Sequence, residues 1–274
     1  METQQPKVSF VTVNYKMLNF IRHLLQGVQD AHLPFSFEYF LVDNDSKDGM
    51  AEFVRKEFPW VTVIEAGYNN GFAVGNNLGI KQARGEYIIP LNPDLIVFPG
   101  EIEKWIAWMD AHPDVGISGP RLRNPNGDDQ NSCFQFHNLM TPVYRRTFIG
   151  RFGFAKRAMD RYTMKDLDRS KEQEVDFILG AAMCVRRSLH EKIGGFDERF
   201  FMYFEDEDWC RRAWKHGSRV MYTPVAEIRH YYRRQSRIKR PWEIFTNRVA
   251  RIHVASGVKY FWKYWGESNP RVGK

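Results

Sequence analysis

A strand pattern with an abrupt polar end occupies residues 87–94, which are Tyr87-Ile88-Ile89-Pro90-Leu91-Asn92-Pro93-Asp94. The aromatic and β-branched residues of its first half are typical of a buried strand. Because proline disfavours the helical region for the residue before it, Asn92-Pro93 predicts an extended or turn conformation at the strand's end. Asp94 is therefore expected at the carboxyl end of a strand, where open α/β sheets bind ligands and where a carboxylate suits a divalent metal. A turn with a surface aspartate is the alternative for this stretch alone.

The residues before this strand alternate between strand and helix patterns. Strands are expected at 8–14, 38–42 and 61–64, and amphipathic or short helices at 17–28, 51–58 and from about 71 to 84. Such an order predicts an α/β fold with a mostly parallel, doubly wound sheet and flanking helices.

The pattern after Asp94 is less regular. A helix at 101–111 and a strand at 115–118 lead into residues 121–173, a polar and locally basic segment expected to pass over the active face. Order returns at 175–185, followed by a turn at 194–197, a helix that begins at 205 and extends to His216-Gly217, a strand at 219–223 and an extended segment at 226–230. Small residues at Gly180-Ala181-Ala182 permit close approach of backbone or ligand.

The composition fits a globular chain of one large domain or two small ones. The 274 residues are 43% hydrophobic, which is ample for a sizeable core. The three cysteines have no CxxC spacing, which argues against a zinc site or a disulfide framework and fits a reducing compartment. The amino-terminal residues show no apolar signal segment, and no apolar run approaches the ~18 residues that span a bilayer. A cytoplasmic location is therefore expected.

Four consecutive carboxylates follow an aromatic run at the start of the helix that begins at Glu205. The helix dipole favours one or two acids there, but four in a row repel one another. Partial desolvation by the aromatic residues raises a carboxyl pKa, which makes a useful general base. We therefore expect function from Glu205-Asp206-Glu207-Asp208. His230 lies one strand further on, where the chain returns to the same face, and a neutral imidazole is a common metal ligand.

Two polar turns precede the acidic helix. Residues 43–49 combine turn formers with several side chains able to contact a ligand. Residues 68–77 enter a helix through glycine and asparagine, and such an amino terminus favours anions such as phosphate.

These motifs, taken in order, resemble the family 2 glycosyltransferases of the GT-A fold, and more narrowly the bacterial rhamnosyltransferases that build surface polysaccharides such as O-antigen. The matching segments are Val11-Thr12-Val13-Asn14-Tyr15, residues 42–49, Asn70-Gly71-Phe72-Ala73 with Asn76-Asn77, Leu91-Asn92-Pro93-Asp94, Gly180-Ala181-Ala182, Gly194-Gly195-Phe196-Asp197, Phe204-Glu205-Asp206-Glu207-Asp208 and His230. The resemblance covers residues 8–230.

The resemblance implies a role for residues in each motif. The donor nucleotide would contact Thr12, Asn14, Asp43, Ser46, Asn70, Gly71, Asn77 and Asn92, with Asp43 at the edge of the base. The metal, Mg or Mn, would be held by Asp94 and His230. Asp206 would be the catalytic base, with Gly180, Ala181, Glu205 and Asp208 nearby on the acceptor side. Asn92 stands where the fuller family motif has an acid, so this chain has one fewer anionic metal ligand.

The implied reaction is an inverting, metal-dependent transfer. A cation on the diphosphate stabilises the leaving group, and a carboxylate opposite removes the proton of the acceptor hydroxyl. One base and one direct attack invert the anomeric carbon. The expected donor is a nucleotide-diphosphate sugar, with dTDP-rhamnose first, and the expected acceptor is a saccharide or polyprenyl-linked saccharide.

The net charge of +7 resides in one segment near the C-terminus. Eight basic residues and one acid lie between Arg229 and Arg251, and they account for the whole excess. We divide the chain into a catalytic domain, 1–230, and a basic, aromatic helical extension, 231–274. The extension predicts contact with an anionic membrane surface, on the cytoplasmic face of the inner membrane. A solvated helix packed on the body or a homodimer contact is the alternative, and Arg233, Arg234 and Arg237 are alternatively expected to hold the donor's diphosphate.

Two other activities compete with glycosyl transfer. A sugar-nucleotide nucleotidyltransferase would need a glycine-rich amino-terminal loop, and Val13-Asn14-Tyr15-Lys16 has no glycine. A nucleic-acid-binding protein would use the basic segment, but the balanced charge of the remaining chain argues against it.

Overall fold

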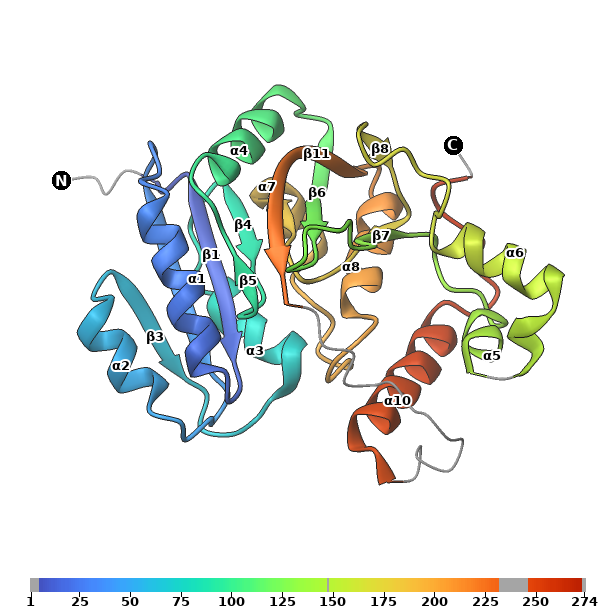
Figure 1. The fold of residues 1–274 in the computed structure, drawn as a ribbon, viewed down its shortest axis with the longest axis horizontal. Helices are drawn as coiled ribbons and strands as arrows, with labels where there is room; N and C mark the ends of the chain where they lie inside the picture. The colour runs from blue at the N-terminus through green and yellow to red at the C-terminus, as the bar shows by residue number, and fades with distance from the viewer. Residues whose placement is uncertain (1–4, 147, 232–245, 273–274) are drawn as a thin grey trace.

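The computed structural model describes residues 5–146, 148–231 and 246–272, and within them nine strands form one sheet and two more form a small ribbon (Figure 1). The strands are β1 (Val8–Asn14), β2 (Phe37–Asp43), β3 (Val61–Glu65), β4 (Tyr87–Pro90), β5 (Leu95–Ile96), β6 (Val115–Arg123), β7 (Cys133–Phe134), β8 (Gln173–Glu174), β9 (Phe177–Ile178), β10 (Cys184–Arg186) and β11 (Arg219–His230). The helices are α1 (Leu18–Asp30), α2 (Met50–Glu57), α3 (Gly71–Ile80), α4 (Glu101–Ala111), α5 (Thr141–Arg146), η1 (Phe148–Arg151), α6 (Gly153–Tyr162), α7 (Arg187–Ile193), α8 (Glu205–Lys215) and α10 (Arg248–Lys263).

The large sheet is mostly parallel, as the sequence predicts. Its order is β3-β2-β1-β4-β10-β6-β11-β5, with β8 also paired to β11. The pairs β1–β2, β2–β3, β1–β4 and β6–β11 are parallel, whereas β10 runs antiparallel to β4 and β6. Because β1, β2 and β4 run in the same direction, the polar residues that follow them meet at one edge of the sheet.

Helices bury apolar residues on both faces of the sheet. One core packs α1, α2 and α4 against sheet side chains such as Phe10, Tyr39 and Leu41. The other packs α3, α7 and α8 against side chains such as Val11 and Ile88. Successive strand residues point to opposite faces, so neighbours such as Phe10 and Val11 belong to different cores.

Several boundaries differ from the predicted ones. The expected strand at 87–94 is divided, because Asn92-Pro93-Asp94 form the turn between β4 and β5. The expected segments at 219–223 and 226–230 are one strand, β11, whose register shifts between Thr223 and Glu227. Pro224 lies in that interval and has no N–H to donate to the ladder, which explains the shift.

Residues 121–173, which the sequence pattern left unassigned, contain three short helical elements and parts of three strands. β6 continues to Arg123, and α5, η1 and α6 project beyond β7 at the side of the molecule away from β3 (Figure 1). Helix α7 also had no predicted counterpart, and α3 ends at Ile80, before the expected residue 84.

The C-terminal helix α10 packs against the segment that precedes α8. Tyr260 and Tyr264 join Phe200 and Phe204 in a third apolar cluster. In the described ranges, no helix is long and apolar enough to cross a bilayer. Residues 232–245 of the predicted basic, aromatic extension lie outside the described residues.

Candidate active site

The ends of β1 and β2 place three predicted donor residues together. Asn14 is opposite Asp43 in the parallel ladder. The Asn14 amide donates to the Ser46 hydroxyl at 2.9 Å, and the Ser46 backbone N–H donates to Asp43 Oδ1 at 3.0 Å. The turn after β2 is therefore fixed by side chains from two strand ends. Thr12 lies elsewhere: it is fully buried, and its hydroxyl bonds the Tyr39 hydroxyl at 2.7 Å inside the core.

The loop before α3 is held against the segment that leads to α8. Gly71 has φ +80°, and an added Cβ would lie 2.2 Å from the Phe201 carbonyl oxygen. The Phe72 N–H donates to that same carbonyl, and the Asn44 amide donates to the Gly71 carbonyl at 2.8 Å. Only glycine combines this conformation with this close approach. Asn70 precedes it as the residue before the helix.

Asn77, predicted to border the diphosphate, uses its amide to hold a turn. Its Nδ2 donates to the Phe196 carbonyl at 2.8 Å, and its Oδ1 accepts from the Phe196 N–H at 3.0 Å. Nδ2 also lies 3.1 Å from Glu198 Oε1. The side chain thus fixes the 194–198 turn, which in turn packs beside α8 through Phe196 and Trp209.

Asp94 and His230, the two predicted metal ligands, are neighbours in space although far apart in sequence. The distance from His230 Nε2 to Asp94 Oδ1 is 3.3 Å. β11 ends at His230 and pairs with β5 directly after Asp94, and the Tyr231 N–H donates to the Asp94 carbonyl at 2.9 Å. His230 Nδ1 lies 2.7 Å from Gln130 Oε1. Donation from Nδ1 to this amide oxygen leaves the Nε2 lone pair on the Asp94 side, which suits metal ligation.

The residues at this point fit a divalent cation. Besides the carboxylate and the imidazole, Asn92 Oδ1 is buried and has no hydrogen-bond partner in the described part of the chain. Such an orphaned acceptor beside a carboxylate is a ligand type that Mg and Mn accept. No group of three His, Cys, Asp or Glu side chains gathers as a metal site within residues 5–146, 148–231 and 246–272. Protein groups would therefore supply part of the coordination and substrate oxygens the rest.

Asp206 lies at the start of α8 in a buried, hydrogen-bonded position. Its Oδ2 accepts from the Gly180 N–H at 2.9 Å and its Oδ1 from the Glu207 N–H at 2.8 Å. Burial raises the pKa of Asp206 to about 6, although these two hydrogen bonds act in the opposite direction. A carboxylate with such a pKa is poised to accept a proton near neutral pH.

The other three acids of the helix start have different environments. Glu205 is buried, its Oε2 has no partner among the described residues, and burial followed by the adjacent Asp206 raises its pKa well above the usual range. Glu207 Oε2 pairs with His137 Nδ1 at 2.5 Å. Asp208 is fully buried and contacts Arg212, Lys263 and the Tyr264 hydroxyl. The expected repulsion is therefore relieved by pairing at two acids and by the raised pKa of the others.

The backbone that delivers Asp206 is in a sparsely populated conformation. Tyr203 and Phe204 have φ values of +73° and +69°. Two successive non-glycine residues in this region store strain that the surroundings must offset. Helix α10 provides contacts for this: the Ser256 hydroxyl donates to the Met202 carbonyl at 2.9 Å, and the Tyr260 ring packs 5.3 Å from that of Phe204.

A short chain of backbone hydrogen bonds connects the Asn92–Asp94 turn to Asp206. The Asn92 N–H donates to the Ala181 carbonyl at 2.8 Å, and Gly180 donates to Asp206. A Cβ on Gly180 would lie 3.1 Å from the Cβ of Asp206, so a larger residue at position 180 would displace the Asp206 side chain. The structure thus brings together Asn92, Asp94, Gly180, Ala181, Asp206 and His230. Asp208 points into its ion-pair network, and Arg233, Arg234 and Arg237 lie outside the described residues.

Sequence patterns did not identify Gln130, His137, Lys263 and Tyr264. Each contacts a predicted site residue from a segment far away in the chain. His137 and Gln130 lie in the unassigned polar segment, and neither has a local motif that would have identified it.

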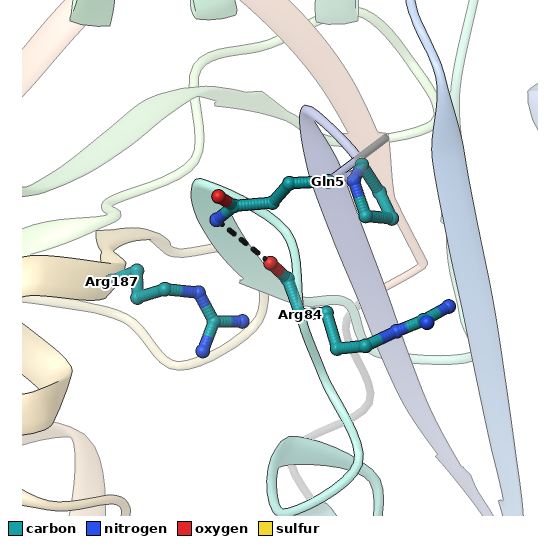
Figure 2. A pocket seen from close by; sticks show the side chains of 4 residues that line it. Gln5, Arg84 and Arg187 are labelled. Atoms are coloured by element: carbon teal, nitrogen blue, oxygen red, sulfur yellow. Dashed lines mark hydrogen bonds between the residues drawn. The ribbon is translucent and has the colours of Figure 1, made fainter. Parts of the chain in front are cut away.

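A pocket lined by Gln5, Pro6, Arg84 and Arg187 lies at the amino ends of β1 and β4, the opposite edge from Asp94 (Figure 2). Its polar groups serve the fold. Arg187 donates to the Gly85 and Ala83 carbonyls, each at 2.6 Å, and the Gln5 amide donates to the Arg84 carbonyl at 3.0 Å. This pocket is therefore separate from the site built by the strand ends.

Residues 9–194 match the family model described as glycosyl transferase family 2. The chain is a family 2 glycosyltransferase. It is an enzyme of the transferase class, and its central, mostly parallel sheet has the GT-A arrangement. The assignment favours glycosyl transfer over the nucleotidyltransferase and nucleic-acid-binding hypotheses.

Two curated relatives of this glycosyltransferase are named as rhamnosyltransferases. The N-acetylglucosaminyl-diphospho-decaprenol L-rhamnosyltransferase of Mycobacterium tuberculosis is 32% identical over 202 residues, which are 70% of this chain and 65% of that protein. Rhamnosyltransferase WbbL of Escherichia coli is 25% identical over 265 residues, 92% of each chain. The chain thus spans slightly less than two thirds of the mycobacterial relative.

Solved structures share the fold at low sequence identity. The mannosyltransferase PcManGT from Pyrobaculum calidifontis, in complex with GDP-Man and Mn2+, has a TM-score of 0.62 at 19% identity. The match covers 98% of this chain and 67% of the mannosyltransferase. Staphylococcus aureus TarS has a TM-score of 0.58 at 17% identity, over 82% of this chain and 37% of its own.

Proposed function

We propose that this glycosyltransferase moves a sugar, rhamnose from dTDP-rhamnose, to a hydroxyl of a polyprenyl-diphosphate-linked saccharide, with inversion and with a divalent metal. The observation that carries the proposal is the connection of Asp206 to Asn92 and Asp94 through Gly180 and Ala181. It joins a buried carboxylate of raised pKa to a strand-end turn with ligands for a cation. The names of the mycobacterial and Escherichia coli relatives support the sugar and the acceptor class.

Each side of the site has a separate task. Asn14, Asp43 and Ser46, with the Asn70-Gly71 loop, bind the donor nucleotide. Asp94, His230 and Asn92 would hold the metal, which would neutralise charge on the diphosphate leaving group.

Asp206 removes the proton of the acceptor hydroxyl as that oxygen attacks the anomeric carbon. One base opposite one leaving group gives a single displacement, and therefore inversion. The Gly180 N–H donates to Asp206 Oδ2, and the absence of a side chain on Gly180 leaves room beside the carboxylate. Glu205, whose raised pKa favours its neutral form, adds no second negative charge beside the base.

We place the catalytic domain at 1–230, with 231–274 as an extension, and expect action at the cytoplasmic face of the inner membrane. The first test is thermal stabilisation by dTDP, UDP, GDP and CDP, each with and without Mn. A ligand of the native state raises the unfolding temperature. A shift with dTDP that Mn increases is expected, and transfer from dTDP-rhamnose should follow. The absence of a shift with every nucleotide would overturn the donor site, and a shift with another nucleotide alone would replace rhamnose as the sugar.

A further inference from the structure

The segment that contains α5, η1 and α6 has an unusual charge pattern. Between residues 139 and 159 there are five basic residues and no acid. The basic residues are Arg145, Arg146, Arg151, Lys156 and Arg157. This charge is independent of the C-terminal basic segment, because it lies about eighty residues earlier in the chain and on different helices.

The same segment exposes three phenylalanines that contact one another. Phe148, Phe152 and Phe154 are 71%, 53% and 53% exposed. The ring centroids of Phe148 and Phe152 are 6.4 Å apart, and Phe152 and Phe154 stack at 6.0 Å. Exposed apolar side chains scattered singly are ordinary on a protein surface, but a contiguous aromatic group marks a binding surface.

The core does not need these rings. Helix α6 is amphipathic, with Ala155 and Tyr162 buried on its inner side. Phe152 and Phe154 lie outside that stripe, at its amino-terminal end. Phe152 and Phe154 therefore do not contribute to the buried face of α6. Their exposure is better explained by a binding partner than by packing within the chain.

Two exposed arginines lie close to the aromatic residues in the chain. Arg157 approaches Gly153, between Phe152 and Phe154, with its Nη1 3.7 Å from the position of an added Cβ. Arg151 is exposed between Phe148 and Phe152 in the chain. The ion pairs among residues 5–146, 148–231 and 246–272 include neither arginine, and the nearby acid Asp160 pairs with Lys165. We name Phe148, Phe152, Phe154, Arg151 and Arg157 the aromatic–basic patch.

Hydrogen bonds of His137 and Tyr162 anchor this segment beside the start of α8. It begins at His137, whose backbone N–H donates to Glu207 Oε1 at 2.7 Å and whose Nδ1 pairs with Glu207 Oε2. It ends at Tyr162, whose hydroxyl lies 2.9 Å from His137 Nε2. Glu207 directly follows Asp206. The projection formed by α5 and α6 is thus attached to the acceptor side of the site (Figure 1).

We propose that the aromatic–basic patch docks on an anionic lipid bilayer and holds the acceptor side of the site at the headgroup level. Aromatic rings enter the interfacial region, and unpaired arginines are attracted to anionic headgroups. The purpose of this contact rests on the proposed function, because a polyprenyl-linked acceptor presents its hydroxyl at that level. The C-terminal segment offers a competing surface, since Trp262 and Trp265 are also exposed.

The experiment measures flotation of the full chain with vesicles of phosphatidylethanolamine and phosphatidylglycerol, against vesicles of phosphatidylcholine. Changing Phe148, Phe152 and Phe154 together to serine should weaken binding to the anionic vesicles by at least about tenfold. The double variant Arg151→Glu, Arg157→Glu should weaken this binding to the same extent, and the remaining binding should depend less on salt concentration. The matched control, Trp262→Ser with Trp265→Ser, should bind within about threefold of the unchanged chain.

Normal flotation of the serine variant would overturn the proposal. If only the tryptophan variant then lost flotation, membrane contact would belong to the C-terminal segment. The remaining case is a serine variant that floats normally but changes oligomeric state in sedimentation velocity. The last result would assign the patch to a second copy of the chain. An unchanged unfolding temperature and nucleotide-induced shift show that each variant is folded.

Transfer assays separate this proposal from the proposed function. The serine variant should transfer normally to a water-soluble, short-chain acceptor and poorly to an acceptor embedded in vesicles. If the unchanged chain floats through the patch but transfers to neither acceptor, the docking proposal stands and the proposed function fails.

Discussion

The proposed donor side and the proposed acceptor side of this site are held in place by different kinds of interaction. On the donor side, parallel strands carry Asn14, Asp43 and Asn92 to one edge of the sheet through backbone ladders. On the acceptor side, Asp206 follows a strained turn that side chains of α10 support from about fifty residues away. A strand ladder fixes position by repeating local geometry, whereas a braced helix start depends on specific distant contacts. The two sides should therefore respond differently to substitution.

The largest expected effect separates chemistry from donor binding. Asp206→Asn should lower the rate of transfer by about a thousandfold, because the amide does not accept the acceptor's proton. The nucleotide-induced thermal shift should remain, since the donor side is untouched. The matched control is Glu205→Gln, which replaces a carboxyl of raised pKa by a neutral group of the same shape and should change the rate by less than about tenfold. Substantial turnover in Asp206→Asn together with loss in Glu205→Gln would make Glu205 the base.

The same carboxyl should make the protein's stability depend on pH. The pKa of Asp206 is raised from 3.8 to about 6 in the folded state, so the folded chain binds the proton more tightly than the unfolded chain. The stabilisation from the protonated form is complete below pH 3.8 and is lost as pH rises through about 6. Asp206→Asn removes this loss, and it should raise the free energy of unfolding by up to about 3 kcal/mol at pH 8.

Denaturant titrations of the wild-type protein and of Asp206→Asn at pH 4 and pH 8 measure this difference in the free energy of unfolding. Most of the gain should be gone at pH 4, because the folded wild-type Asp206 is then protonated and the pH lies only just above the unfolded-state pKa of 3.8. Activity of the unchanged chain should rise with pH through about 6 as the base ionises. An equal gain at both pH values would attribute the effect to packing rather than to ionisation.

The support from α10 is tested through the ion pair between its Lys263 and the buried Asp208 of α8. Lys263→Met leaves the fully buried Asp208 without one of its cationic partners, and the free energy of unfolding should fall by about 2–3 kcal/mol. Lys259→Met on the same helix removes only an exposed hydrogen bond to the Arg199 carbonyl and should change it by less than about 0.5 kcal/mol. Chemical denaturation of the two variants makes the comparison. Equal values would show that α10 does not stabilise α8 through this pair.

The proposed donor side is tested through the two residues that we propose as metal ligands, Asp94 and His230. Asp94→Ala should raise the Mn concentration needed for half-maximal transfer by at least about tenfold, because it removes the carboxylate of the Asp94–His230 pair. The unfolding temperature should change little, since the backbone ladder positions the turn. Metal titration of transfer gives the answer, and a curve that coincides with that of the unchanged chain would remove Asp94 from the site.

The smallest expected effect is a gain in apparent metal affinity. Asn92→Asp places a second carboxylate at the buried position of Oδ1, which has no partner among the described residues. Added negative charge should lower the Mn concentration for half-maximal transfer by about threefold to tenfold. The same titration measures it. A higher Mn requirement would show that the Asn92 side chain lies away from the cation.

Local patterns were sufficient for much of the fold. The bounds predicted for β1 and α4 coincide with the observed ones, because each has a clear periodicity between strong turn signals. The mostly parallel sheet followed from the alternation of strands and helices. Residues 121–173 could not be assigned, since their short helices take their stability from contacts such as His137–Glu207 rather than from a periodic core face.

The sequence by itself determined that polar residues end the strands at one edge and that four carboxylates begin a helix. Only the tertiary structure decided what each of these groups does. It places His230 beside Asp94. It pairs Asp208 with Lys263 and Glu207 with His137, and it leaves Asp206 buried with a raised pKa. The physical reason is that burial and charge partners, which set a carboxyl's protonation, come from segments distant in the chain, whereas strand and helix patterns depend on neighbouring residues.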